Sequence, residues 1–151
     1  MNAGHPVRAG TALDAARRHR AEMGEAVQAL AEAVAAPATP AAWRSTVATR
    51  LGVLRERLQQ HVVVTEGPEG LYAEMLEHAP RLSRQIAALT ADHRALRVAV
   101  DTLARRLRDP ARPVERLRPA AEELLAQLSH HRQQGADLVY EAYTTDIGGE
   151  T

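Results

Sequence analysis

The sequence contains no cysteine and no phenylalanine, and aromatic residues make up only 3% of its 151 residues. Without cysteine, disulfides, thiolate metal sites and thiol nucleophiles are excluded. Lys and Arg balance Asp and Glu at 19 each, so no net charge draws the chain towards nucleic acid or an anionic membrane. No signal peptide is recognisable, and no apolar run approaches the roughly 18 residues that span a bilayer. We therefore expect a cytoplasmic protein that binds neither nucleic acid nor membrane.

Strands are not expected either, because no segment alternates polar and apolar residues with a period of two. Four segments instead carry apolar residues at alternating spacings of three and four, which is typical of helices that each bury one face. Breaks rich in proline or glycine separate these segments. We expect helices over about 11–36, 41–66, 80–108 and 114–143, with a short amphipathic piece at 71–78.

Four long helices with short connections favour an all-α fold, an antiparallel up-down-up-down four-helix bundle. The domain organisation expected from this pattern is a flexible arm over residues 1–10, the bundle over 11–143 and a C-terminal tail over 144–151.

Each of the four apolar stripes contains one histidine where a leucine or valine is expected: His19, His61, His93 and His131. In an antiparallel pair of helices, two residues share one height when the turn falls midway between them. The midpoints of these positions are residues 40, 77 and 112, and all three fall in expected connections. The spacing therefore predicts that the four imidazoles converge in one layer of the core.

A layer of buried histidines has two interpretations. Each ring could be satisfied by a neighbouring group or a water molecule, as single core histidines often are. Four rings without partners would cost about 1–3 kcal/mol each, whereas a metal ion turns the same rings into ligands. We therefore favour a metal site, because bundle cores are a common place for one.

Carboxylates near the histidines could bind the ion or orient the rings. Glu66 follows His61 by five residues, roughly 140° further round the helix, so it could turn inward as a ligand or remain a solvated helix end. Asp92 and Glu22 could hold their neighbouring histidines or face solvent. No separate acid–base pair is recognisable, and the sequence leaves open whether the protein is an enzyme.

A glycine and a tyrosine could shape the space beside the histidine layer. Gly135 lies one turn after His131, which leaves either a pocket for a small ligand or room for close helix packing. Among the three tyrosines, Tyr140 is the one that we expect closest to the layer.

Several short pieces of the sequence recur in this order in one known family. They are Arg18–Glu22, His61–Glu66, Gly70–Tyr72, Asp92–Arg94 and His130–Arg132. From about Ala16 to Tyr143 the chain thus resembles the hemerythrin-like (HHE cation-binding) family. The resemblance implies an antiparallel bundle with a non-haem di-iron centre that binds or senses oxygen, nitric oxide or peroxide. It would make His19, His61, His93 and His131 metal ligands.

The chain departs from the family pattern at several ligand positions, where it has Thr65, Leu89 or Thr90, and Gly135 or Ala136. With so few carboxylates, a single iron or zinc ion on His19, His61, His93 and His131, with Glu66 as a further candidate, fits better than a di-iron centre. Its expected partner is a small diatomic molecule or a peroxide. The alternatives are a metal-free regulatory or interaction bundle and a haem clamped between two facing histidines.

Overall fold

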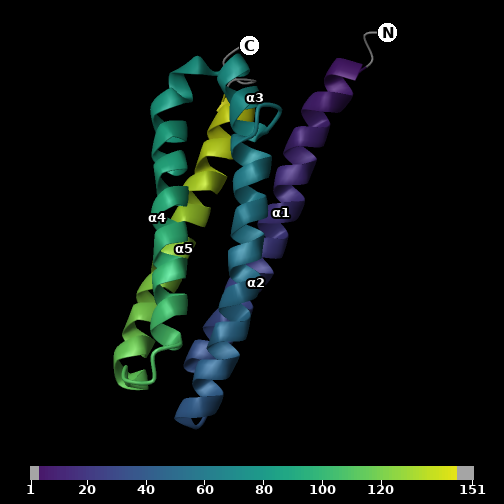
Figure 1. Cartoon of the computed structure of the whole chain (residues 1–151). Helices are drawn as coiled ribbons and strands as arrows, with labels where there is room; N and C mark the ends of the chain where they lie inside the picture. Colours follow the sequence, from purple (N-terminus) through teal and green to yellow (C-terminus); the bar gives the residue numbers. More distant parts are fainter. Residues whose placement is uncertain (1–3, 146–151) are drawn as a thin grey trace.

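The computed structural model describes residues 4–145, and all regular structure in that range is helical (Figure 1). The long helices are α1 (Gly4–Ala35), α2 (Pro40–Glu66), α4 (Ser83–Leu107) and α5 (Val114–Tyr140). Shorter pieces are α3 (Leu71–His78), the 3-10 turn η1 (Pro80–Leu82) and the π turn η2 (Glu141–Thr145). The prediction of an all-helical bundle without strands is thus confirmed for the described residues.

Local sequence explains most of the helix ends. Thr39 caps α2 by accepting a hydrogen bond from the Ala42 amide at 3.2 Å, and Pro40 occupies the first turn, where no helical N–H bond is lost. Gly67 ends α2, and its amide donates back to the Val63 carbonyl at 3.0 Å. The breaks expected near residues 37–40, 67–70 and 109–113 therefore coincide with the observed connections.

The first helix differs from its predicted extent. α1 begins at Gly4 and not near Thr11, so helical backbone runs through much of the expected arm at residues 1–10. Pro6 does not prevent this because it falls in the first turn, where proline is tolerated. The expected C-terminal tail, 144–151, lies outside the described residues from 146 onwards, as do residues 1–3.

The helices pair along the chain. Figure 1 shows α1 beside α2 and α4 beside α5, each pair joined by a short connection at the lower end of the view. At the upper end α3 and η1 carry the chain from α2 to α4. The N-terminal part of α1 leans away from the other helices towards the right of the view. None of the helices in the described range is long and apolar enough to cross a membrane.

The core consists of two apolar clusters. The larger one is built by all four long helices and contains Trp43, whose indole Nε1 donates to the Val34 carbonyl at 3.0 Å. The smaller one lies around α3 and includes Leu71, Met75 and Leu82. Along α4 and α5 the buried histidines occur between the stretches that belong to the two clusters, and on α2 His61 follows the last residue of the larger cluster, Leu58. A polar layer therefore divides the hydrophobic core.

Candidate metal centre

Three of the predicted histidines meet in this polar layer. His61 on α2, His93 on α4 and His131 on α5 each offer a ring nitrogen, and these three atoms all lie within 4.8 Å of one another. The ring centroids are 4.9 Å apart for His61 and His93, 4.7 Å for His93 and His131, and 5.8 Å for His61 and His131. His61, His93 and His131 are buried, with 9%, 1% and 3% of their surface exposed, respectively. Three nitrogen ligands at about 2.0–2.1 Å from one zinc ion lie roughly 3.4 Å apart, so the three rings are near the separation that a single ion requires.

His19 is not a member of this cluster. Its Nδ1 lies 3.5 Å from Glu22 Oε1, one turn further along α1, and a quarter of its side chain is exposed (25%). Of the four imidazoles that we expected to converge, the structure brings three within ligand distance of one another among the described residues. His19 is near enough to His61 for its charge to contribute to the lowered His61 pKa, but its Nδ1 lies against Glu22.

Glu66 lies against one of the clustered rings. Its Oε2 is 2.5 Å from His93 Nδ1, so the carboxylate is placed to orient this ring. Glu66 is the last residue of α2, so its side chain reaches across to α4 just before the chain turns at Gly67. A carboxylate on Nδ1 selects the tautomer whose Nε2 lone pair is free to bind a metal.

His131 has a similar partner. Asp92 Oδ2 lies 3.3 Å from His131 Nδ1, so Asp92 holds a ring on α5 and not the neighbouring His93 that we expected. Two of the three rings therefore have a carboxylate on Nδ1, which makes Nε2 their candidate metal ligand. This carboxylate–histidine pairing is the arrangement that commonly holds metal-binding imidazoles in place.

Two ring nitrogens of the clustered histidines lack hydrogen-bond partners within the described range. His61 Nδ1 and His93 Nε2 are buried and make no hydrogen bond to any described residue. A buried polar atom without a partner costs about 1–3 kcal/mol. Coordination of a cation by these lone pairs would remove that cost, so the donor set fits a metal ion.

The histidines are held in the neutral form, which is the form that binds metals. Burial lowers the pKa of His61 from 6.5 to about 3, and the neighbouring His93 and His131 add to the shift. Burial also lowers the pKa of His93 and of His131, while Asp92 opposes the shift at both rings. At neutral pH no proton competes for the lone pairs.

The aromatic neighbour of the cluster is Tyr72 on α3. Its ring stacks on His93 with centroids 6.0 Å apart and planes 11° from parallel. Burial raises the pKa of the Tyr72 hydroxyl well above its ordinary value. The expectation for Tyr140 is wrong, because that residue is 68% exposed. Tyr140 lies two residues after the buried Leu138, which turns it off the stripe that faces the core.

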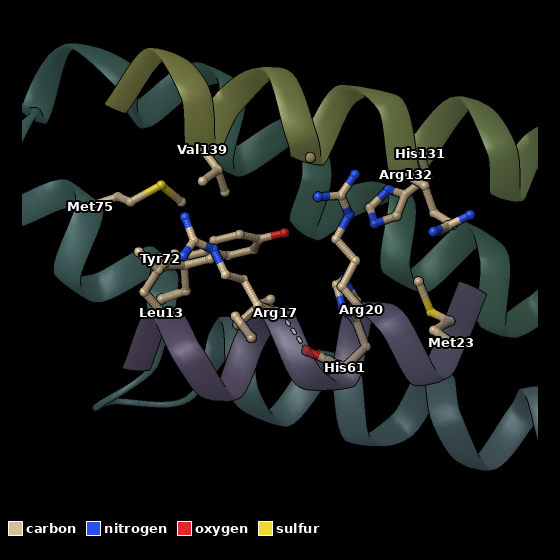
Figure 2. Close-up of a pocket in the computed structure, with 14 residues that line it drawn as sticks. Leu13, Arg17, Arg20, Met23, His61, Tyr72, Met75, His131, Arg132 and Val139 are labelled. Carbon is tan, nitrogen blue, oxygen red and sulfur yellow. Dashed lines mark hydrogen bonds between the residues drawn. The ribbon is translucent and has the colours of Figure 1, made fainter. Parts of the chain in front are cut away.

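A cavity of about 60 Å³ adjoins the cluster between α1, α2, α3 and α5 (Figure 2). His61 and His131 form part of its wall, so a small molecule in it could reach the histidines. Gly135 also lines it, and a Cβ built there would meet nothing within 4 Å. The pocket that the sequence indicated as one reading of Gly135 is therefore present.

Three arginines also line this cavity: Arg17, Arg20 and Arg132. Sequence reasoning did not single them out as a group, because arginine is frequent throughout the chain and their proximity depends on how α1 packs against α5. Burial lowers the pKa of the Arg132 guanidinium, and the charge of Arg20 acts in the same direction.

The arrangement offers neutral imidazoles from three helices, carboxylates that orient two of them, and a small adjoining cavity. The chain matches no protein-family model, no curated protein and no solved structure.

Proposed function

We propose that this chain is a hemerythrin-like metal-binding protein that binds, senses or reacts with a small molecule such as oxygen, nitric oxide or peroxide. His61, His93 and His131 would hold a single non-haem ion, iron in first place and zinc in second. The observation that carries the proposal is the buried group of three imidazoles, two of which have core nitrogens without a hydrogen-bond partner. The proposed fold is the antiparallel up-down-up-down bundle of that family, supported by the short connections within the two helix pairs.

Each residue has a distinct task in this proposal. Glu66 and Asp92 fix the rings of His93 and His131 and leave their Nε2 atoms free. Tyr72 covers His93 from the side of α3 and excludes water from that face. When bound, the ion supplies an open coordination position for a small ligand, since three protein ligands leave at least one site free.

The size of the adjoining cavity favours a bare ion over a haem. Its volume is about 60 Å³, which is enough for a few small molecules of the size of water and far less than a porphyrin needs. A metal-free regulatory bundle, the other alternative, would leave His61 Nδ1 and His93 Nε2 buried without partners among the described residues.

Elemental analysis tests the proposal directly. The full chain should be purified without a histidine tag from medium supplemented with iron and zinc, and analysed together with its absorption spectrum. We expect about one ion per chain. His93→Ala should lose the metal, whereas the exposed His78→Ala serves as the matched control and should retain it.

A wild-type protein with far less than one ion per chain would overturn the metal proposal and favour the metal-free bundle. His19→Ala decides a separate point. If the three-histidine cluster is the ligand set, this variant should bind metal as the wild type does, because His19 lies outside the cluster. Loss of metal in His19→Ala would show that α1 moves in to supply a fourth ligand.

A further inference from the structure

Arg20 on α1 is a cation near the histidine cluster that has no partner among the described residues. Its Nε atom is buried and makes no hydrogen bond there. Arg20 also takes part in no ion pair within residues 4–145, because the carboxylate of Glu22 lies against His19 and Arg57 instead. A buried donor without an acceptor is costly, so a ligand that accepts from Arg20 would remove that cost.

Arg20 lies in the wall of the cavity that adjoins the cluster. His61 and His131 line the same cavity, and Figure 2 shows the Arg20 side chain extending from α1 towards α5. The positive charge of Arg20 also contributes to the lowered pKa of His61, so its field acts at that ring. A small molecule in the cavity would therefore have Arg20 and two of the proposed metal ligands as neighbours.

The other two arginines of this cavity have different surroundings. Figure 2 shows the Arg17 guanidinium near Tyr72 and Met75, and Arg17 is an exposed residue. The Arg132 guanidinium packs against α1, since a Cβ built at Gly24 would lie 2.6 Å from Arg132 Nη2. Arg20 is therefore the arginine that we assign to a ligand next to the histidines.

The charges around the cluster favour one negative ligand. The clustered histidines are neutral, and the carboxylates of Glu66 and Asp92 on two Nδ1 atoms match the two positive charges of a divalent ion. No carboxylate of a described residue lines the cavity, so Arg20 has no balancing charge in it. A monoanion in contact with Arg20 supplies that charge, and the guanidinium fork offers it charge-assisted hydrogen bonds.

The volume of the cavity limits the ligand to a few atoms. It measures about 60 Å³, on the scale where one water needs about 10–15 Å³. An anion of two or three heavy atoms fits this space. Superoxide, hydroperoxide and azide are anions of this size.

We propose that Arg20 binds a small monoanion in the cavity beside His61 and His131, and so makes the site prefer anions to neutral diatomic molecules. This inference rests on the proposed metal function and names the class of its ligand. Superoxide or hydroperoxide would then be favoured over oxygen and nitric oxide. The task of Arg20 is to hold the anion next to the open coordination position.

Ligand titrations of the full chain, freed of metal with a chelator and reloaded with cobalt(II), test the inference. Cobalt(II) occupies nitrogen sites that suit zinc or iron(II), and its visible absorption changes when a ligand enters an open position. The probes are azide, a monoanion, and imidazole, which is largely neutral at about pH 8. Cobalt per chain is measured first for every variant, so that loss of the metal is not mistaken for loss of anion binding.

Variants locate the anion. Arg20→Gln should weaken azide binding by roughly tenfold or more, because it removes a charge-assisted hydrogen bond, and should leave the affinity for imidazole unchanged. Arg20→Lys keeps the charge without the planar fork and should recover part of the loss. Arg18→Gln removes the same charge from an exposed position of α1 and should bind azide as the wild type does.

Four results would contradict the inference. Equal azide affinity in the wild type and Arg20→Gln, with cobalt bound in both, would overturn it and leave the metal proposal intact. An equal loss in Arg18→Gln and Arg20→Gln would also overturn it, since net charge and not a contact would then govern binding. Parallel losses of azide and imidazole in Arg20→Gln would show that Arg20 shapes the site without preferring anions. A wild-type chain that binds no cobalt would overturn both proposals.

Discussion

Acid should destabilise the metal-free protein, and His61 allows the size of the effect to be worked out. The pKa of His61 is 6.5 in an unfolded chain and about 3 in the folded protein, chiefly because the ring is buried. Below pH 6.5 the unfolded chain therefore binds a proton that the folded chain does not. The contribution of His61 to the free energy of unfolding therefore falls as the pH drops from about 6.5 towards 3. Above pH 6.5 this contribution does not change.

Between pH 7 and pH 5 this difference amounts to about 2 kcal/mol from His61 alone, at 1.36 kcal/mol per pKa unit. His93 and His131 also have lowered pKa values and act in the same direction. A loss of this size is a large fraction of the 5–15 kcal/mol that is typical for a domain.

Urea unfolding of chelator-treated protein at several pH values between 5 and 7.5 measures the effect. In the wild type, the midpoint should fall steadily below pH 6.5 with little change in the slope of the transition. His61→Leu should lose about 2 kcal/mol less between pH 7 and pH 5, because leucine has no proton to gain. His78→Gln changes an exposed histidine on α3 and should follow the wild type. A wild-type midpoint that does not change between pH 7 and pH 5, or an equal loss in His61→Leu, would refute the reasoning.

Two further predictions concern orientation and local packing. Glu66→Gln should weaken metal binding by roughly 10–100-fold in competition with a chelator, because it removes the carboxylate from His93 Nδ1. The control Glu77→Gln, which changes an exposed residue of α3, should leave metal binding unchanged. Equal affinities would show that Glu66 does not orient the ring. Gly52→Ala should raise the melting temperature, corresponding to about 0.5–1 kcal/mol, since a Cβ there meets nothing within 4 Å inside α2. Gly70→Ala should lower it, because its Cβ would lie 2.8–3.0 Å from three backbone oxygens. A lower melting temperature for Gly52→Ala than for Gly70→Ala, measured by calorimetry, would contradict this account of the two glycines.

Much of the fold could be predicted because its signals are local. Apolar residues at spacings of three and four define which face of each helix is buried, and this angle depends only on helix geometry. The stripes through His61, His93 and His131 are buried as that pattern indicates. The connections at Pro40 and Gly67 follow from residues that cannot continue a helix or that cap the next one.

The candidate site could be predicted only in part, because the apolar periodicity of one helix does not determine its distance from the other helices. His19 lies on the predicted stripe of α1, yet its ring contacts Glu22 and is not part of the cluster. Glu66 was a candidate ligand by its angle on the helix, but the end of α2 places its carboxylate on His93. Tyr72 stacks on His93 because α3 lies beside the cluster, and the spacing of residues in the sequence does not predict where α3 packs.

The sequence by itself determined that the chain is helical, where its helices break, and that histidines replace apolar residues in buried stripes. Only the tertiary structure decided which of those histidines meet, which carboxylates orient them, and that a small cavity adjoins them. The physical reason is that helix periodicity sets direction around one axis. The tilt and separation of several axes depend on how all the side chains pack together.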